Sequence, residues 1–345
     1  MNRFTLTNAL TPAAALEALR PDTAPGGKEK PLDFARLNAR RPLAGGSDLL
    51  GEIKEGIISP ELVVNLKPIA AWRGIEHTPD GGWRIGATTL IADVAAHDWL
   101  PSHCGALADA AEHVGSPQIR NQGTVGGNLC QRPRCWYYRH GDTVCLKKGG
   151  KACLAKEGEN KYLAVFATDA PCVMASQTNL GAALLAVGGI VHVHGEAGER
   201  DVPADEFYRL PTADDPYRET NLAPGEVVAA ISVRRDDGRR SAYLQMSEKA
   251  DFDWALVSAA TAVWTANDGT VRDIRLVLNA VAPMPWRLTK AEDFLRGKRA
   301  DQATLREAAA LALEDAKPLG HNAYKVAVAK ALVPRVIVRA LTGKS

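Results

Sequence analysis

The spacing of apolar residues predicts short strands that alternate with helices over the first part of the chain. Apolar residues run together or alternate in four predicted strands, at residues 62–66, 83–87, 190–194 and 227–233. They share one face in four predicted helices, at residues 11–19, 90–100, 102–113 and 180–187. Thr11 followed by Pro12 is typical of a helix start. The stretch rich in Pro, Gly and Lys at residues 22–31 is predicted to form a loop.

The last part of the chain has a different pattern, in which strands come first and helices follow. Three longer strands are predicted, at residues 242–248, 256–265 and 271–282. Asn267-Asp268-Gly269 would form the hairpin turn between the second and the third. Three helices are predicted after them, at residues 285–295, 301–313 and 323–341. This order indicates an α+β unit, and the charged connector at residues 234–240 indicates a domain boundary before it.

Composition narrows the class of protein. A chain of 345 residues is long enough for two or three domains, and a formal net charge of +2 gives no electrostatic case for nucleic acid or an anionic membrane as partner. No stretch approaches eighteen uninterrupted apolar residues, so no membrane insertion is expected. The N-terminus lacks the pattern of an export signal, which favours a cytoplasmic protein with reduced thiols.

Two glycine-rich stretches are candidates for binding an anion. The longer one spans residues 114–129, and its glycines lack the Cβ atoms that would keep a ligand away from the backbone. Consecutive N–H groups can then converge on a group such as a pyrophosphate. The shorter one, at residues 44–51, combines a Gly-Gly turn with a Ser/Asp helix start, which is a natural phosphate seat. Taken alone, the shorter stretch is equally compatible with an ordinary turn.

Five of the six cysteines lie between residues 130 and 172, in a polar stretch with little apolar periodicity. A bound metal centre would explain how such a stretch stays ordered. Zinc sites usually contain a closely spaced cysteine pair, and only Cys130 and Cys135 approach that spacing. An iron-sulfur cluster needs four thiolates but tolerates irregular spacing. From the spacing alone, a cluster, a zinc site and free thiols all remain open. Cys104, in a predicted helix, is expected to be buried and inert.

Three motifs occur in order along the chain: Ala44-Gly45-Gly46-Ser47-Asp48-Leu49-Leu50, Ile85-Gly86-Ala87-Thr88-Thr89-Leu90 and Gln118-Ile119-Arg120-Asn121-Gln122-Gly123-Thr124-Val125-Gly126-Gly127-Asn128-Leu129. Together they resemble the FAD-binding subunit of the molybdenum hydroxylases, the xanthine dehydrogenase and carbon monoxide dehydrogenase family. The resemblance continues through residues 247–253, 281–287 and 322–326, so it covers nearly the whole chain. The Arg-Asn-x-Gly-Thr-x-Gly-Gly-Asn core is quite specific, unlike a lone glycine pair.

The resemblance implies an α+β fold in which a two-part FAD-binding domain of the vanillyl-alcohol-oxidase-like type, at residues 1–233, precedes a domain at residues 241–345. The first domain would divide into subdomains of about residues 1–60 and 61–233, and the second would have a three-stranded antiparallel sheet with helices. In that family the two glycine-rich stretches cradle the FAD pyrophosphate. The residues that the resemblance places at FAD are Ala44, Gly45, Gly46, Ser47, Asp48, Leu49, Gly86, Thr89, Gly123, Thr124, Gly126, Gly127, Asn128 and Asn179, with Lys249 and Trp286 near the flavin.

Most such subunits run directly from Gly-Gly-Asn-Leu into the next element, whereas here residues 130–172 intervene. An insertion of this kind resembles two branches of the family, the periplasmic aldehyde oxidoreductases and the 4-hydroxybenzoyl-CoA reductases, in which this subunit carries an extra 4Fe-4S cluster. Cys130 is the reserve ligand, because it directly follows the flavin motif. The cluster ligands that the resemblance implies are Cys135, Cys145, Cys153 and Cys172.

One position departs from the family pattern. Where the family usually has Pro-Ser-Asp-Leu after the last cysteine, this chain has Gln177-Thr178-Asn179-Leu180. Asn179 can still cap a helix and form hydrogen bonds, but it brings no negative charge near the flavin. This departure allows a shifted flavin potential or a different electron acceptor.

The resemblance therefore predicts the electron-exit subunit of a heterotrimeric molybdenum enzyme, with FAD and a 4Fe-4S cluster as cofactors. An aldehyde or an aromatic or heterocyclic substrate would react on a molybdopterin-binding large subunit. Electrons would pass through a 2Fe-2S small subunit to this chain and on to an external acceptor. Two alternatives remain: a self-contained FAD-dependent oxidoreductase and a zinc-stabilised, non-catalytic assembly protein. Export together with a signal-bearing partner would make the location periplasmic instead of cytoplasmic.

Overall fold

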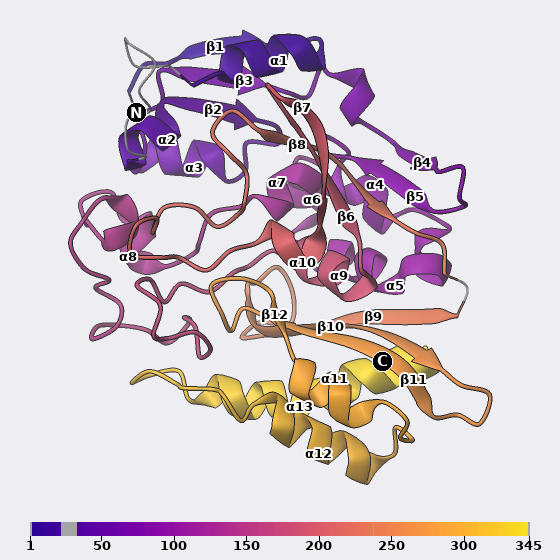
Figure 1. The fold of residues 1–345 in the computed structure, drawn as a ribbon. Helices are drawn as coiled ribbons and strands as arrows, with labels where there is room; N and C mark the ends of the chain where they lie inside the picture. The colour runs from indigo at the N-terminus through magenta and orange to yellow at the C-terminus, as the bar shows by residue number, and fades with distance from the viewer. Residues whose placement is uncertain (1, 22–32, 237, 344–345) are drawn as a thin grey trace.

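The computed structural model describes residues 2–21, 33–236 and 238–343. The loop expected at residues 22–31 lies outside the described residues. Three sheets and the helices beside them give the described chain the mixed α+β fold that the sequence predicts (Figure 1). Within the described ranges, no helix is long and apolar enough to cross a membrane.

A small parallel sheet lies at the N-terminal end of the molecule. Its strands lie in the order β1 (Thr5–Asn8), β3 (Leu62–Asn65) and β2 (Arg40–Leu43). Three helices lie between its strands in the chain: α1 (Pro12–Leu19) and α2 (Phe34–Ala39) between β1 and β2, and α3 (Leu49–Lys54) between β2 and β3. The Thr11 hydroxyl accepts a hydrogen bond from the Ala14 N–H at 3.2 Å and so caps α1. The structure therefore confirms the first predicted helix and, as β3, the first predicted strand.

A five-stranded antiparallel sheet forms the middle of the molecule. Its strands lie in the order β4 (Ile75–His77), β5 (Trp83–Gly86), β8 (Val227–Val233), β6 (Ile190–Gly195) and β7 (Gly198–Pro203). The short turn η1 (Ala70–Trp72) accompanies this sheet. The helices that accompany it are α4 (Ile91–Ala95), α5 (Leu100–Glu112), α6 (Pro117–Arg120), α7 (Val125–Leu129), α9 (Asn179–Val187) and α10 (Ala204–Phe207). Strands β5, β6 and β8 and helix α9 confirm sequence predictions.

The boundary between two predicted helices lies at a different place in the chain from the one expected. The helix expected at residues 90–100 ends at Ala95, and α5 then begins at Leu100. Pro101 explains this start, because proline fits the first turn of a helix but not its interior. α5 is also kinked at Cys104, whose φ of −150° and ψ of 55° are not helical. The Cys104 side chain is fully buried, as predicted.

The C-terminal sheet has four antiparallel strands, not the three predicted. They lie in the order β12 (Trp286–Arg287), β11 (Val271–Asn279), β10 (Ala255–Thr265) and β9 (Arg239–Ser247). β12 pairs with β11, so the helix expected from Pro285 begins only after this strand, as α11 (Thr289–Leu295). β11 ends before Ala280, whose φ of 63° is left-handed and breaks the ladder.

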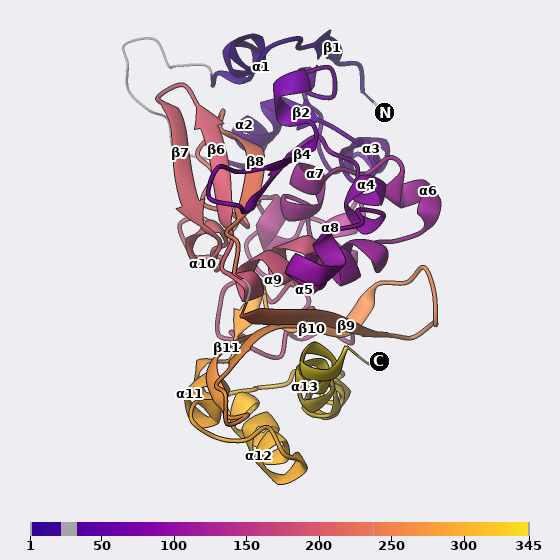
Figure 2. The same ribbon diagram turned by 90° about the vertical axis from the view of Figure 1, so that its right-hand side faces the viewer.

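Two hydrophobic cores meet at the C-terminal sheet. One core joins the five-stranded sheet and helices α5 and α9 to the inner face of this sheet; its members include Val191, Leu107, Leu184 and Val277. The other core lies between the outer face and three helices: α11, α12 (Gln302–Ala312) and α13 (Tyr324–Thr342). Figure 2 shows α5 and α9 on one side of this sheet and α11, α12 and α13 on the other. The C-terminal sheet is therefore covered on both faces and connects the two halves of the chain.

The cysteine segment, which we define as residues 130–178, contains little regular structure, as its polar sequence predicts. Its only regular elements are the short helix α8 (Trp136–Arg139) and the turn η2 (Leu146–Lys148). Leu49 and Ile53 of α3 share a buried cluster with Tyr138 of α8. The segment thus packs beside the N-terminal helices, where Figure 1 shows α8 below α3.

The start of α13 anchors the cysteine segment through buried polar contacts. Lys325 is fully buried, and its ammonium group donates hydrogen bonds to the backbone oxygens of Tyr162 and Ala280, each at 2.7 Å. The side-chain amide of Asn322 donates to the Ala164 oxygen at 2.9 Å. Burial lowers the pKa of Lys325 to about 7, because the charged form loses its hydration.

We expect Lys325 to make the stability of the protein depend on pH. In the unfolded chain this lysine has its ordinary pKa of 10.5, so above pH 7 the unfolded state binds more protons than the folded state. Stability should therefore rise with pH, by at most about 3 kcal/mol between pH 7 and pH 9. Urea unfolding of the wild type and of Lys325→Met at both pH values measures the effect. A rise of the same size in both proteins would contradict the assignment to Lys325.

Candidate functional site

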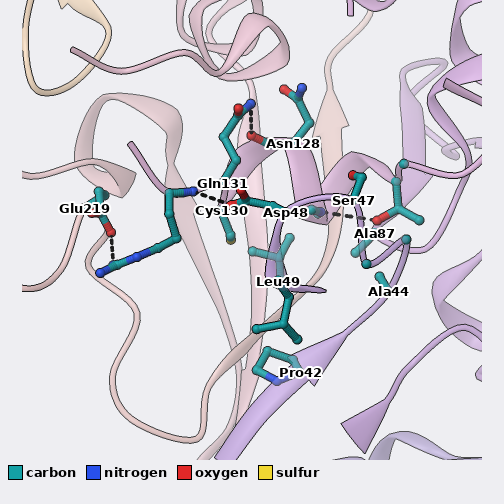
Figure 3. Close-up of a pocket in the computed structure, with 18 of the residues that line it drawn as sticks. Pro42, Ala44, Ser47, Asp48, Leu49, Ala87, Asn128, Cys130, Gln131 and Glu219 are labelled. Atoms are coloured by element: carbon teal, nitrogen blue, oxygen red, sulfur yellow. Dashed lines mark hydrogen bonds and ion pairs between the residues drawn. The ribbon is translucent and has the colours of Figure 1, made fainter. Parts of the chain in front are cut away.

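A cavity of about 630 Å³ lies between the two glycine-rich stretches (Figure 3). Its wall combines residues near the start of α3, residues of α7 and residues around the start of β10. Most of the predicted cofactor-binding residues line it: Ala44, Gly45, Gly46, Ser47, Asp48, Leu49, Gly123, Thr124, Gly126, Gly127, Asn128 and Asn179. The fold thus brings together motifs that lie far apart in the sequence.

The two glycine-rich stretches touch each other at one wall of this cavity. The side-chain amide of Gln122 donates a hydrogen bond to the Gly45 oxygen at 2.9 Å. A Cβ atom on Gly45 would lie 2.2 Å from the Gln122 backbone oxygen, closer than any tolerable contact. Gly46 has a φ of 73°, in the left-handed region that glycine adopts without strain. Glycine at these two positions is therefore a condition for the close approach of the two stretches.

The second glycine stretch is held against the turn that follows β5. Thr124 caps α7, because its hydroxyl accepts a hydrogen bond from the Gly127 N–H at 3.3 Å. The Gly126 N–H donates to the Ala87 oxygen at 2.8 Å. A Cβ atom on Gly126 would lie 3.0 Å from the Ala87 Cβ, which is a tight contact. Thr124 and Gly126 together fix the path of the backbone along the cavity.

Two asparagines connect the second glycine stretch to α9 and to the C-terminal sheet. The side-chain oxygen of Asn128 accepts a hydrogen bond from the Leu180 N–H at 3.1 Å. The side-chain amide of Asn179 donates to the Tyr243 hydroxyl at 2.9 Å and to the Gln245 side-chain oxygen at 3.1 Å. No local sequence pattern marks Tyr243 and Gln245, because these two partners of Asn179 lie far from it in the chain.

Some of the predicted cofactor residues do not line this cavity: Gly86, Thr89, Lys249 and Trp286. A Cβ atom on Gly86 would lie 2.3 Å from the Trp72 oxygen, and the Thr89 hydroxyl donates to the Gly74 oxygen at 3.0 Å. Lys249 is exposed, whereas the Trp286 ring stacks on Phe166 with ring centroids 5.6 Å apart. Gly86 and Thr89 therefore shape the structure behind the cavity, while Lys249 and Trp286 lie outside the cavity wall.

Asp48, in the first glycine stretch, is held by three arginines of the cysteine segment. Its Oδ2 accepts a hydrogen bond from the Arg132 N–H at 2.7 Å. Its Oδ1 pairs with the guanidinium groups of Arg134 at 2.8 Å and Arg139 at 2.6 Å. Burial would raise the pKa of Asp48, but the two guanidinium groups outweigh burial and lower the pKa below its usual value. Asp48 is thus a stable anion, and no sequence motif marks the arginines that hold it, because they lie more than 80 residues further along the chain.

The four cysteines predicted as metal ligands line a second, smaller cavity: Cys135, Cys145, Cys153 and Cys172. Contact with the Cys172 thiol lowers the pKa of Cys153 to about 6, and the same contact raises the pKa of Cys172. Cys130 lines the first cavity instead. Among the described residues, no three His, Cys, Asp or Glu side chains are placed to hold one metal ion. The structure therefore brings the four predicted cysteines to one place and separates Cys130 from them.

A buried polar wall separates the two cavities. Glu52, Arg132 and Glu219 line the first cavity, and Tyr138 and Lys147 line the second. Arg132 donates a hydrogen bond to the Tyr138 hydroxyl at 3.0 Å and forms an ion pair with Glu219. The Tyr138 hydroxyl donates to Glu52, and Lys147 pairs with Glu219 at 2.7 Å. Burial raises the pKa of Tyr138, so this hydroxyl remains a hydrogen-bond donor.

Two family models cover most of the chain. Residues 33–234 match the FAD binding domain in molybdopterin dehydrogenase. Residues 241–340 match the CO dehydrogenase flavoprotein C-terminal domain. The chain belongs to the FAD-binding medium subunits of the molybdenum hydroxylase family. This result confirms the family that the motifs predict, and with it an oxidoreductase subunit.

Relatives of this medium subunit match it over most of its length. The aldehyde oxidoreductase FAD-binding subunit PaoB of Escherichia coli (strain K12) is 30% identical over 343 residues, which are 99% of each chain. The carbon monoxide dehydrogenase medium chain of Hydrogenophaga pseudoflava is 29% identical over 301 residues, covering 86% of this chain and 87% of that one. A solved carbon monoxide dehydrogenase from Hydrogenophaga pseudoflava has a TM-score of 0.74 at 25% identity and covers 100% of this chain and 99% of its own.

The first cavity of this medium subunit fits a dinucleotide. At Gly45 a side chain would break the contact between the two stretches, so the backbone itself forms the wall there. Two buried nitrogens at the same cavity, Arg41 Nε and Arg132 Nη2, have no hydrogen-bond partner in the described structure. Phosphate oxygens suit guanidinium donors of this kind. The cavity therefore offers guanidinium donors and a backbone surface without side chains, and both suit the phosphates of an anionic ligand.

Gly45→Ala is expected to weaken FAD binding, because the added methyl group pushes the two glycine stretches apart. Overpacking of this kind costs about 1–3 kcal/mol, which corresponds to a roughly tenfold to hundredfold loss of affinity. Gly51→Ala is the matched control, since a Cβ atom there meets nothing within 4 Å. Titration of the FAD-free chains with FAD measures the difference. Equal affinity of Gly45→Ala and the wild type would disprove the importance of the close approach.

Proposed function

We propose that this medium subunit carries a 4Fe-4S cluster in addition to FAD and passes electrons from a molybdenum-containing partner to an external acceptor. One observation carries the proposal: four of the five cysteines of the insertion line one cavity, which a polar wall separates from the larger cavity. Four thiolates are the donor set that such a cluster requires. The proposed ligands are Cys135, Cys145, Cys153 and Cys172, and Cys130 is left out because it lines the other cavity.

We place FAD in the larger cavity, between the two glycine-rich stretches. FAD, when bound, can accept electrons singly and release them in pairs, which suits a junction between one-electron and two-electron carriers. The chain supplies backbone N–H groups for the phosphates from residues 44–49 and 123–128. The arginine partners of Asp48 neutralise it, so its carboxylate does not repel these phosphates. Asn179 presents a neutral amide at the same cavity.

The partners that we propose are a molybdopterin-binding large subunit and a 2Fe-2S small subunit. The names of two relatives, a carbon monoxide dehydrogenase medium chain and a nicotine 6-hydroxylase medium subunit, support membership of a multi-subunit complex. The organic substrate reacts on the large subunit, so no side chain of this chain acts on it as acid or base. We propose an aldehyde, because a relative that is 30% identical over 99% of each chain belongs to an aldehyde oxidoreductase, and a glyceraldehyde dehydrogenase medium chain also matches.

The proposal includes the finer assignments of fold and location. We assign an FAD-binding domain of the vanillyl-alcohol-oxidase-like type to residues 1–233, divided near residue 60, and a second domain to residues 241–345. The change from mixed strands and helices to a sheet followed by three helices supports this boundary. A cytoplasmic location is proposed, since that compartment keeps thiols reduced, and the alternative is the periplasm, reached by export together with a signal-bearing partner.

The wild-type chain, purified anaerobically, is expected to contain about four irons and four sulfides together with FAD. Cys153→Ser should lose most of the iron and still bind added FAD, because Cys153 lines only the cysteine cavity. Cys104→Ala is the matched control and should keep its iron, since Cys104 is buried away from both cavities. Metal and sulfide analysis with the visible spectrum measures these contents. Flavin without iron, or stoichiometric zinc without sulfide, would exclude the proposed cluster.

Asn179→Asp is expected to lower the reduction potential of bound FAD. The change adds a negative charge at a buried position of the cavity wall, and negative charge opposes the uptake of electrons. For the two-electron couple of FAD, we expect a shift on the order of 30 mV, which corresponds to about 1.4 kcal/mol. Spectroelectrochemical titration measures the potential. Asn179→Ser shortens the side chain without adding charge, so an equal fall in both variants would assign the effect to lost hydrogen bonds instead.

A further inference from the structure

Arg134 lies where three separate parts of the chain meet at the FAD cavity. It belongs to the cysteine segment and directly precedes the proposed ligand Cys135. Its Nη1 pairs with Asp48 of the first glycine stretch at 2.8 Å. Its guanidinium carbon lies 4.3 Å from the centroid of the Trp254 ring, just before β10. Arg134, Asp48 and Trp254 all line the cavity, so one arginine connects the cysteine segment, the glycine stretch and the C-terminal sheet there.

The hydrogen-bonding capacity of Arg134 is only partly used. A guanidinium group has five N–H donors. Asp48 takes one from Nη1, and the Gln131 side-chain oxygen takes one from Nη2 at 3.2 Å. The buried Nε has no partner in the described structure. Each Nη therefore has a second N–H that these contacts do not use. The side chain lies at the cavity wall and is 24% exposed. These two donors can bind an acceptor inside the cavity.

The position of these donors is set before a ligand arrives. An arginine that stacks on an aromatic ring and pairs with a carboxylate has few orientations left. Arg134 makes both contacts, with Trp254 and with Asp48. A donor that is already oriented loses less conformational entropy on binding, so its hydrogen bond contributes more to affinity.

We propose that Arg134 is an FAD-binding residue, which donates a charge-assisted hydrogen bond to an acceptor oxygen of the cofactor. The cysteine segment then takes part in FAD binding itself, in addition to supplying thiols. The acceptor is a pyrophosphate oxygen or a carbonyl oxygen of the flavin ring, both of which suit a guanidinium donor. The inference rests on FAD binding by this subunit and not on the cluster, so the iron content of the protein does not bear on it.

Arg139 offers a matched comparison for Arg134. It belongs to the same segment and pairs with the same Asp48 oxygen, at 2.6 Å. It does not line the FAD cavity, and its guanidinium lies over the Tyr138 ring at 5.5 Å instead of over Trp254. Loss of either arginine removes one cation from Asp48, but only loss of Arg134 removes a donor from the cavity wall.

The test is titration of the FAD-free, full-length chain with FAD, for the wild type and three variants: Arg134→Gln, Arg134→Lys and Arg139→Gln. We expect Arg134→Gln to raise the Kd on the order of tenfold to a hundredfold, which is the effect of one charge-assisted hydrogen bond. Arg139→Gln should raise it much less, and Arg134→Lys should recover part of the loss because it keeps the charge. Circular dichroism and thermal unfolding verify that each variant is folded.

Equal losses in Arg134→Gln and Arg139→Gln would assign the effect to Asp48 and overturn the proposal. An unchanged Kd in Arg134→Gln would overturn it as well. A titration with ADP, which has the pyrophosphate but no flavin, then identifies the acceptor. Weaker ADP binding in Arg134→Gln assigns the pyrophosphate, and unchanged ADP binding with weaker FAD binding assigns the flavin ring. If the wild-type chain itself binds no FAD, both the FAD assignment and the role of Arg134 are overturned. If the wild type binds FAD and Arg134→Gln binds it equally well, only the role of Arg134 is overturned.

Discussion

The ion pairs of Asp48 with Arg134 and Arg139 hold the two candidate cofactor sites to each other. A largely buried carboxylate is costly without partners, and an unpaired one would repel the phosphates of FAD bound as we propose. The cysteine segment supplies the two guanidinium groups and, from Arg132, a backbone N–H that complete the surroundings of Asp48. The first glycine stretch therefore depends on the cysteine segment for its charge balance. The cysteine segment depends on the glycine stretch in turn for its position.

This mutual dependence also explains how a long polar segment stays ordered. Tyr138 is buried against α3, and Arg132 donates a hydrogen bond to its hydroxyl and pairs with Glu219. Buried polar networks stabilise a structure only when their members are paired, so each contact here requires the others. At the far end of the segment, Lys325 and Asn322 bind its backbone oxygens. The segment is thus held at both ends by parts of the chain distant from it in sequence.

Local patterns predicted most elements of the fold because each of those elements depends on neighbouring residues. Thr11 caps α1 from within the same turn, and apolar periodicity alone indicates β8 and α13. The errors lie where a tertiary contact decides the outcome. β12 exists because two residues after Pro285 pair with β11, which delays the helix predicted there. Likewise, β11 ends at Asn279 because the Ala280 N–H bonds to the Ser176 oxygen instead of continuing the ladder.

The sequence by itself determined the family, and with it the FAD-binding, oxidoreductase character of the subunit. It could do so because positions such as Gly45 admit no side chain, and a steric requirement of that kind is visible as a local motif. Only the tertiary structure decided what surrounds the motifs: Asp48 is paired with Arg134, and Trp286 stacks on Phe166 away from the FAD cavity. These contacts join residues far apart in the chain, and the spacing of residues along a sequence carries no information about such pairs.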